Sequence, residues 1–258
     1  MAHPNFLLNS STLVIGGSSG IGFAVASAAL ANGSKVHITS VTPQKLAAKI
    51  DQLQSLYPGA RVSGTAADLS NTETLEANMK AVLDDAVKEA GGPLDHIVHS
   101  AGDGLNSTPL AEVTIEMALQ PFTVRYLGSV VIGKLVAAHP GKYLKPTASS
   151  SITFTSGIMV HRPRNFYISL GATGAVESLS TMFAVELAPI RTNVIIPGAV
   201  RTELLDRVTK GNPDAYKDAS LTKQVGTAAE AAEAYLFCMR STLATGQGFT
   251  IDSGYLLA

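Results

Sequence analysis

The feature that most constrains the fold is a glycine-rich segment between an apolar run and a helix-length stretch. Residues 12–15 are mostly apolar, residues 16–22 read Gly-Gly-Ser-Ser-Gly-Ile-Gly, and residues 20–31 are small and helix-compatible. A strand that ends in glycines and leads into a helix lets the backbone turn tightly, and the free N–H groups of the helix then face an anion. The segment predicts a phosphate-binding turn in the first strand–helix unit.

The rest of the chain repeats this alternation of strand-length and helix-length segments. We expect strands at residues 12–15, 35–39, 61–66, 94–99, 151–155, 193–196 and 248–251. We expect helices at residues 20–31, 43–56, 71–90, 118–137, 168–187 and 227–240, with Asn71 or Ser70 capping the third. Such alternation is typical of a parallel sheet with helices on both faces. The predicted fold class is α/β, a single doubly wound, Rossmann-type domain over residues 1–258.

Composition excludes several classes of protein. Of 258 residues, 46% are hydrophobic and 15% are charged, and the net charge is −1. A disordered chain would be less apolar, and a nucleic-acid binder would carry a basic excess. The single cysteine, Cys238, has no partner for an internal disulfide, and no His/Asp/Glu cluster has metal-ligand spacing. Without a signal sequence or an uninterrupted apolar span, we expect a cytoplasmic protein that binds a small molecule, and no membrane, nucleic acid or metal.

Four motifs in order resemble the short-chain dehydrogenase/reductase family. The first is the spacing G-x-x-x-G-x-G at residues 16–22, and the second is Ala-Asp-Leu at residues 67–69. Residues 100–102, Ser-Ala-Gly, resemble the family's Asn-Ala-Gly, and residues 193–202 resemble its Asn-x-(apolar)-Pro-Gly-x-(apolar)-x-Thr stretch. The resemblance covers nearly the whole chain. It implies a dinucleotide-dependent oxidoreductase that forms a homo-oligomer, a dimer or a tetramer.

The resemblance and the predicted strand ends together give a set of cofactor-binding residues. They are Gly16, Ser18, Ser19, Gly20, Ile21, Gly22, Ser40, Thr42, Lys45, Asp68, Leu69, Ser100, Ala101, Gly102, Pro197, Gly198, Val200 and Thr202. An acid after the second strand would bind the ribose 2′-hydroxyl and repel a 2′-phosphate. Residues 40–45 contain no acid but two hydroxyls and a lysine. This favours NADP(H) over NAD(H); the alternative is that these residues only cap the second helix.

The family's catalytic Tyr-x-x-x-Lys pair is missing. Aligning residues 174–179 with the family places Ser169 at the Tyr position and Thr173 at the Lys position. Ser156 then matches the family's Ser, and Arg125 stands at the position of its Asn. Tyr167 lies two residues out of register with the family's Tyr. The catalytic centre therefore keeps one of the four family residues.

This loss has a chemical consequence. Reduction of a carbonyl creates an alkoxide, and a general acid contributes roughly 10²–10⁴-fold to such a step. An iminium ion is already cationic, so hydride addition to it requires no proton. The sequence therefore favours reduction of a C=N bond with NADP(H). It resembles a branch of fungal indole-alkaloid enzymes that lack Tyr and Lys, some of which also guide an intramolecular Diels–Alder reaction in a shaped apolar pocket.

Several charged residues have a functional and a structural interpretation. Arg125 could bind a carbonyl or oxyanion through two N–H donors, or could anchor its helix by an ion pair. Asp103 follows the fourth strand and could stabilise a cationic substrate, or could cap its loop. His161 could face the substrate and carry a proton. We interpret Arg162 and Arg164 as solvated loop charges.

Two other functions stay open, and one segment is assigned to the substrate. The second function is a ketone or alcohol oxidoreductase that uses Ser156 and a displaced Tyr167. The third is a non-catalytic NADP(H)-binding protein. Residues 202–222 contain Gly-Asn-Pro at 211–213 and are predicted to form a substrate lid.

Overall fold

A single parallel sheet organises the chain in a computed structural model that describes residues 4–102, 104–105, 108–163, 168–212 and 214–258. Its seven strands lie in the order β3-β2-β1-β4-β5-β6-β9, and every neighbouring pair is parallel. The strands are β1 (Ser11–Ile15), β2 (Lys35–Ser40), β3 (Val62–Ala66), β4 (His96–His99), β5 (Ser151–Thr155), β6 (Arg191–Pro197) and β9 (Gln247–Ile251). The predicted α/β fold class and all seven predicted strands are confirmed, with shifts of one or two residues at their ends.

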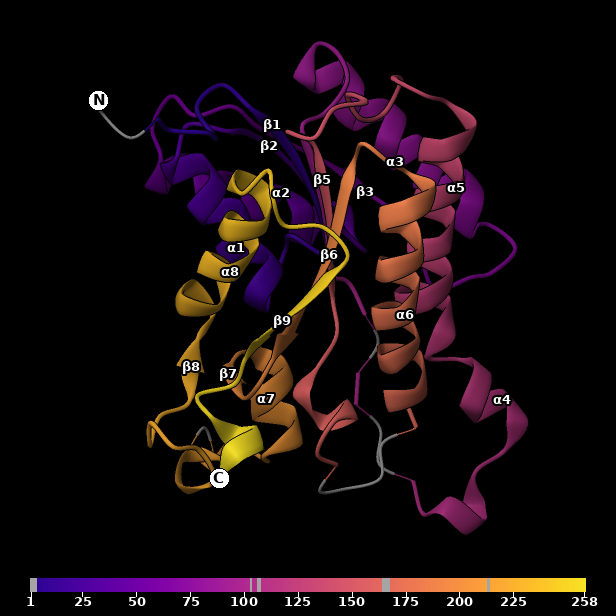
Figure 1. Cartoon of the computed structure of the whole chain (residues 1–258), viewed down its shortest axis with the longest axis vertical. Helices are drawn as coiled ribbons and strands as arrows, with labels where there is room; N and C mark the ends of the chain where they lie inside the picture. The colour runs from indigo at the N-terminus through magenta and orange to yellow at the C-terminus, as the bar shows by residue number, and fades with distance from the viewer. Residues whose placement is uncertain (1–3, 103, 106–107, 164–167, 213) are drawn as a thin grey trace.

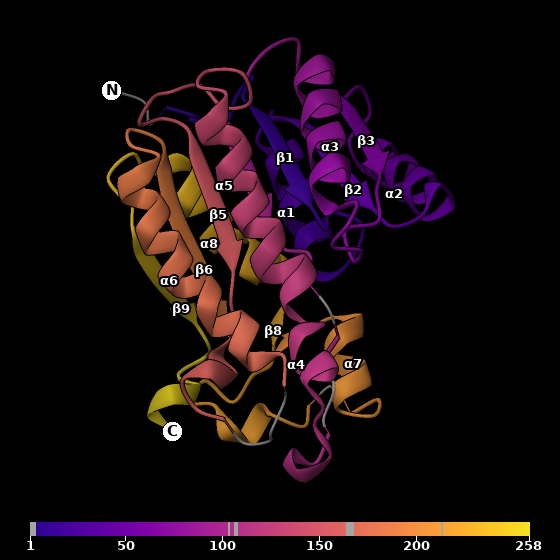
Figure 2. The same ribbon diagram turned by 90° about the vertical axis from the view of Figure 1, so that its right-hand side faces the viewer.

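Helices cover both faces of this sheet (Figures 1 and 2). The helices α1 (Gly20–Ala31), α2 (Pro43–Leu56) and α8 (Ala228–Arg240) lie on one face. The helices α3 (Leu75–Ala90), α5 (Gly128–Ala138) and α6 (Leu170–Glu186) lie on the other. Short elements complete the chain: α4 (Ile115–Leu119), α7 (Glu203–Val208) and a two-residue pairing of β7 (Val200–Arg201) with β8 (Gly226–Thr227).

The alternation of side chains along each strand divides the core into two layers. In β1, Leu13 and Ile15 join the cluster under α3, α5 and α6, whereas Val14 joins the cluster under α1, α2 and α8. All five residues of β1 are buried, which is the pattern of a strand that is covered on both faces. This packing fixes the carboxyl ends of the strands along one edge of the sheet.

The structure corrects two predicted helices. The long helix expected at residues 118–137 is interrupted: α4 ends at Leu119, Pro121 follows, and residues Thr123–Leu127 form a π-helical turn before α5. Pro121 lacks the N–H that a continuous helix needs, and π-turns of this kind concentrate at functional sites. The third helix begins at Leu75 rather than residue 71, because Asn71 Oδ1 accepts the N–H of Glu73 in a local turn at 2.9 Å. The expected Asn71 or Ser70 cap is therefore wrong.

Residues 115–138 form a stretch that is long and apolar enough to cross a membrane, the one such stretch in the described part of the chain. Within this fold, 56% of its most apolar window is buried. Ile132, Leu135 and Val136 of α5 belong to the core cluster beneath the sheet. Packing inside the fold therefore accounts for the apolar character of this stretch.

Three histidines are buried within the strands, and each lies within hydrogen-bond distance of a serine hydroxyl. The pairs are His37–Ser63 at 2.8 Å, His96–Ser151 at 2.9 Å and His99–Ser129 at 3.0 Å. Burial lowers the pKa of His37 to about 4 and the pKa values of His96 and His99 to about 3. These side chains are neutral parts of the core.

Candidate active site

A cleft runs along the carboxyl ends of the strands and has a volume of about 720 Å³. Its walls come from the segments that follow β1 to β6 and from α7. This is the edge where ligands bind in open parallel sheets. All eighteen residues predicted to bind the cofactor line this cleft, so the structure brings the four sequence motifs together.

The glycine-rich turn leaves space that a side chain would fill. Gly16 has φ +86°, a left-handed conformation that favours glycine, and its N–H donates to Thr39 Oγ1 at 2.9 Å. A Cβ on Gly22 would lie 2.3 Å from both the Gly16 carbonyl oxygen and Ser100 Oγ. The first turn of α1 itself contains no acidic residue, although Glu203 of α7 also lines this part of the cleft. The turn fits the diphosphate of a dinucleotide.

The end of β2 carries the residues that would contact the adenosine ribose. Ser40 is buried, and its Oγ has no hydrogen-bond partner among the described residues. A buried hydroxyl without a partner in the protein is suited to a ligand oxygen. Thr42 Oγ1 accepts the N–H of Lys45 at 3.3 Å, so Thr42 does cap α2, as the structural alternative predicted. The Lys45 side chain is exposed at the rim of the same cleft.

Two further predicted cofactor contacts are shaped by local hydrogen bonds. Asp68 Oδ1 accepts the N–H and the hydroxyl of Ser70, which lowers the pKa of the Asp68 carboxyl. Thr202 ends the segment after β6 and caps α7 by accepting the N–H of Leu205 at 3.4 Å. Asp68 therefore remains an anion next to the expected adenine position, and Thr202 connects the cofactor edge to the predicted lid.

Arg125 lies in the π-turn and lines the cleft. It packs against Gly102 so closely that a Cβ on Gly102 would lie 2.1 Å from Arg125 Nη2. Arg125 thus has the position that the substrate-binding interpretation requires, and the alternative of an ion pair that anchors the helix stays open. A guanidinium here presents N–H donors to a polar substrate group beside the Ser-Ala-Gly segment.

Ser156 also lines the cleft, and its hydroxyl is held from behind by a carboxylate. Ser156 Oγ lies 2.5 Å from Glu177 Oε1 and 3.3 Å from the Thr173 carbonyl oxygen. The same carboxylate also contacts His161, whose Nε2 lies 3.0 Å from Glu177 Oε2 and 3.2 Å from Oε1. His161 is not among the residues that line the cleft. The structure thus corrects its predicted place: His161 lies behind Ser156 rather than facing the substrate.

Positions 169 and 173 carry no group that could replace Tyr and Lys. Ser169 is 1% exposed, and its Oγ has no hydrogen-bond partner among the described residues. Thr173 Oγ1 donates to the Ser169 carbonyl oxygen at 2.9 Å, a bond within the helix. Thr173 and the neighbouring Leu170 contribute to the cleft wall. The wall at this point is small and largely apolar.

Some predicted residues lie outside the described part of the chain, and one is corrected. Asp103, Arg164 and Tyr167 are outside the described residues. Arg162 is not a solvated charge: its Nη1 donates to the Tyr255 carbonyl oxygen, and its guanidinium lies over the Tyr255 ring, 5.1 Å from the centroid. Glu177 is a further site residue for which the sequence predicted no role. The sequence feature that could have identified Glu177 is its spacing, because it follows Thr173 by one helical turn and therefore lies on the same face of the helix.

Cleft residues outside the motifs were also missed. Those described by the structure include Leu105, Val124, Met159, Leu170, Arg207, Tyr216 and Tyr255. They come from loops and from the C-terminal segment, which carry no family motif in the sequence. They form the part of the cleft that the glycine-rich turn does not occupy, where a substrate would lie.

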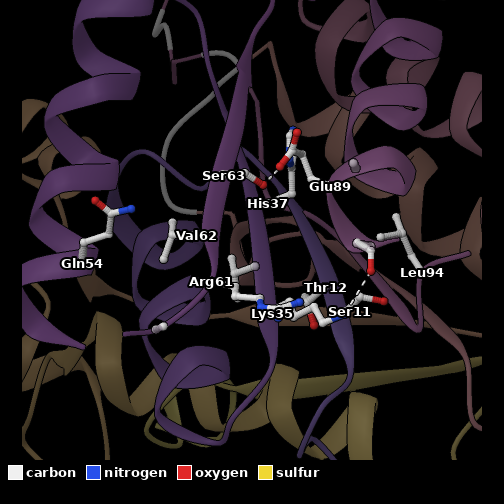
Figure 3. A pocket seen from close by; sticks show the side chains of 14 residues that line it. Ser11, Thr12, Lys35, His37, Gln54, Arg61, Val62, Ser63, Glu89 and Leu94 are labelled. Atoms are coloured by element: carbon white, nitrogen blue, oxygen red, sulfur yellow. Dashed lines mark hydrogen bonds between the residues drawn. The ribbon is translucent and has the colours of Figure 1, made fainter. Parts of the chain in front are cut away.

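A second hollow lies at the opposite, amino ends of β1, β2 and β3 (Figure 3). His37 is bonded there to the hydroxyls of Ser63 and Thr65, and Lys35 Nζ donates to the Ala90 carbonyl oxygen at 3.0 Å. The polar groups of these side chains are satisfied by the protein. This hollow is structural, and the cleft at the carboxyl edge is the candidate active site.

Comparison with known proteins agrees with this geometry. A family model described as an SDR-like Rossmann domain matches residues 3–258. The chain belongs to this family, the short-chain dehydrogenases/reductases. It is 38% identical to the short-chain dehydrogenase/reductase ucsE of Acremonium sp, over 95% of each chain. As a family member it is an oxidoreductase whose Rossmann domain binds a nicotinamide cofactor.

Solved structures of this family superpose closely on the chain. The structure of MalC reductase/Diels–Alderase from Malbranchea aurantiaca is 34% identical in sequence and superposes with a TM-score of 0.89. The match covers 98% of this chain and 99% of that chain. A short-chain dehydrogenase from Burkholderia cenocepacia, solved in complex with NADP, is 25% identical, with a TM-score of 0.83 and coverage of 98% and 99%. The family assignment thus holds over the whole length of these relatives.

Proposed function

We propose that this enzyme reduces a C=N bond, in an imine or iminium intermediate of specialised metabolism, with NADPH. The observation that carries the proposal is the hydrogen bond between Ser156 and Glu177. When Glu177 is ionised, Ser156 donates its proton to the carboxylate, so its lone pairs face the cleft as acceptors. The negative charge of this carboxylate, close behind the cleft wall, stabilises a cationic C=N group, whether the substrate arrives charged or is protonated in the site.

NADPH is the proposed cofactor because of the end of β2. Ser40, Thr42 and Lys45 would hold the 2′-phosphate, Gly16 to Gly22 the diphosphate, and Pro197 to Thr202 the nicotinamide half. When bound, the nicotinamide supplies the hydride. Support also comes from the relative that was solved with NADP. Arg125 would orient a polar group of the substrate by its N–H donors.

A second activity, guidance of an intramolecular Diels–Alder cyclisation, is favoured by one comparison and by the cleft wall. The relative from Malbranchea aurantiaca is a reductase and Diels–Alderase. Ile158, Met159 and Leu170 line the substrate part of the cleft here, and a cycloaddition needs only an apolar pocket that holds a near-attack geometry. Chiral chromatography of the product from an azadiene with a tethered alkene tests this activity: one enantiomer in excess supports it, and a racemate rejects it.

Single-turnover oxidation of NADPH against matched cyclic imines and ketones tests the reductase proposal. We expect 2-methyl-1-pyrroline and 3,4-dihydroisoquinoline to be reduced, and 2-methylcyclopentanone and 1-tetralone to be ignored. Turnover of the ketones alone would identify the ketone reductase that uses a displaced Tyr167, and Tyr167→Phe should then abolish it. NADPH binding without turnover of any substrate would identify a non-catalytic binding protein.

A further inference from the structure

The carboxylate of Glu177 joins the cleft to the protein surface. Ser156 Oγ lies 2.5 Å from Glu177 Oε1, and Ser156 lines the cleft. His161 Nε2 contacts the same carboxylate and lies 3.0 Å from Glu177 Oε2 and 3.2 Å from Oε1. The side chains of Glu177 and His161 are 20% and 39% exposed, so the sequence of contacts runs from the cleft, through a half-buried acid, to a solvated imidazole.

We infer that Ser156, Glu177 and His161 form a proton relay that charges a neutral imine before hydride addition. This inference rests on the proposed C=N reduction. A neutral imine is a weak hydride acceptor, and its protonated form is the reactive one. Glu177 thereby supplies the proton that the family's Tyr and Lys would supply, and this proton reaches the substrate nitrogen through Ser156. Glu177 does not line the cleft, so it acts through Ser156 and is a positioning residue.

The relay begins with Glu177 protonated and passes through the ionised form described above. The Ser156 O–H bond breaks as an N–H bond forms on the imine, and Ser156 takes the Glu177 carboxyl proton at the same time. The resulting Glu177 carboxylate accepts a proton from the His161 imidazolium, which regains one from water. Under the proposed function, the iminium carbon would then accept the hydride that bound NADPH supplies. The sum is one imine, one hydride and one proton giving one amine.

The response of two different substrates separates this role from an anchor of the loop between Ser156 and His161. A purely structural carboxylate would influence every substrate alike, because it would act only through the shape of the cleft. A relay matters most for a substrate that arrives without its proton. A neutral imine and a permanently charged iminium of the same ring system therefore give different responses to loss of the carboxylate.

The test compares 3,4-dihydroisoquinoline with the N-methyl-3,4-dihydroisoquinolinium ion in the natural enzyme and in Glu177→Gln. We expect the variant to lose turnover of the neutral imine by roughly tenfold or more beyond any loss with the charged ion, the scale of general acid catalysis. Glu186→Gln, the same change at the exposed end of α6, should leave both rates as they are. Equal losses with both substrates, or none, overturn the relay while the natural enzyme's turnover still supports C=N reduction.

A second variant keeps the inference testable if Glu177→Gln does not fold. In His161→Ala, added imidazole should restore the lost turnover of the neutral imine, since a free imidazole can return the proton to Glu177. Failure of imidazole to restore that turnover in a folded His161→Ala enzyme overturns the relay. If the natural enzyme reduces neither substrate, the proposed function fails and the relay with it.

Discussion

Arg125 and Gly102 are in such close contact that a methyl group on Gly102 would lie 2.1 Å from Arg125 Nη2. The absence of a side chain at residue 102 therefore sets the position of the guanidinium in the cleft. Gly102→Ala should displace Arg125 and lower imine turnover by roughly 100-fold, the cost of misplacing a reacting group by about 1 Å. Steady-state kinetics measure this, with Gly104→Ala, where a Cβ meets nothing within 4 Å, as the control. Unchanged turnover in Gly102→Ala would contradict a substrate-binding role for Arg125.

Lys45 should decide the choice between the two nicotinamide dinucleotides. In Lys45→Glu, the lost cation and the new anion should weaken NADPH binding by roughly 10- to 100-fold, since one charged hydrogen bond contributes about 1.5–3 kcal/mol. NADH binding should improve, because an acid at this end of β2 can bind the ribose 2′-hydroxyl. Fluorescence titration of each dinucleotide measures both effects.

The matched control for this prediction is Lys49→Glu. Lys49 lies one helical turn further along α2, does not line the cleft, and bonds Gln52 Oε1 at 2.9 Å. Lys49→Glu makes the same change of charge as Lys45→Glu, so its long-range electrostatic effect on NADPH binding is similar. If Lys45→Glu and Lys49→Glu weaken NADPH binding equally, Lys45 makes no direct contact with the phosphate.

Gly22 should be required for cofactor binding because of its contact with the first turn. A Cβ on Gly22 would lie 2.3 Å from the Gly16 carbonyl oxygen, which is backbone and cannot rotate away. Gly22→Ala should destabilise the fold by about 1–3 kcal/mol and abolish NADPH binding. Gly171→Ala is the helical control, since its Cβ would meet only Phe122 at 3.7 Å. Urea unfolding and calorimetric titration check the two effects, and NADPH binding retained by Gly22→Ala would disprove the predicted cradle.

The buried histidines should make the fold sensitive to mild acid. The unfolded chain binds a proton on His96 near the ordinary pKa of 6.5, whereas the folded chain does so only near 3. The contribution of each such histidine to the free energy of unfolding is therefore fully present above pH 6.5. It decreases as the pH falls toward 3, by roughly 1.4 kcal/mol per pH unit. Urea unfolding between pH 7 and 5 should show this slope. His96→Gln should lower the slope by the contribution of one histidine, roughly 1.4 kcal/mol per pH unit. A slope in His96→Gln equal to that of the natural chain would contradict this origin.

The cofactor half of the site was predictable because its residues belong to short motifs at the ends of regularly spaced strands. Gly16, Ser40, Asp68 and Ser100 each lie at the end of a strand or within two residues of it, and parallel strands bring their carboxyl ends to one edge of the sheet. The loss of Tyr and Lys was also visible, because Ser169 and Thr173 can be counted back from a family-like segment. The predicted cofactor residues therefore lie together in the folded chain.

What replaces the missing pair was not predictable from the sequence. Glu177 and Ser156 are 21 residues apart, and their contact depends on how the segment after β5 returns to α6. The π-turn at Arg125 was missed for a related reason, because a single shifted backbone hydrogen bond leaves no periodic signature in side chains. Local spacing defines the sheet edge, whereas these contacts are set by tertiary packing.

The most direct test of the proposed chemistry follows the hydride itself. With NADPH carrying two deuteriums at nicotinamide C4, the enzyme should convert 3,4-dihydroisoquinoline to the tetrahydro amine with one deuterium on the carbon of the former C=N bond. Mass spectrometry and NMR of the product measure this, with 1-tetralone in a parallel reaction. We expect deuterated amine and no deuterated alcohol. Deuterated alcohol from the ketone, with no deuterium in the amine, would contradict it.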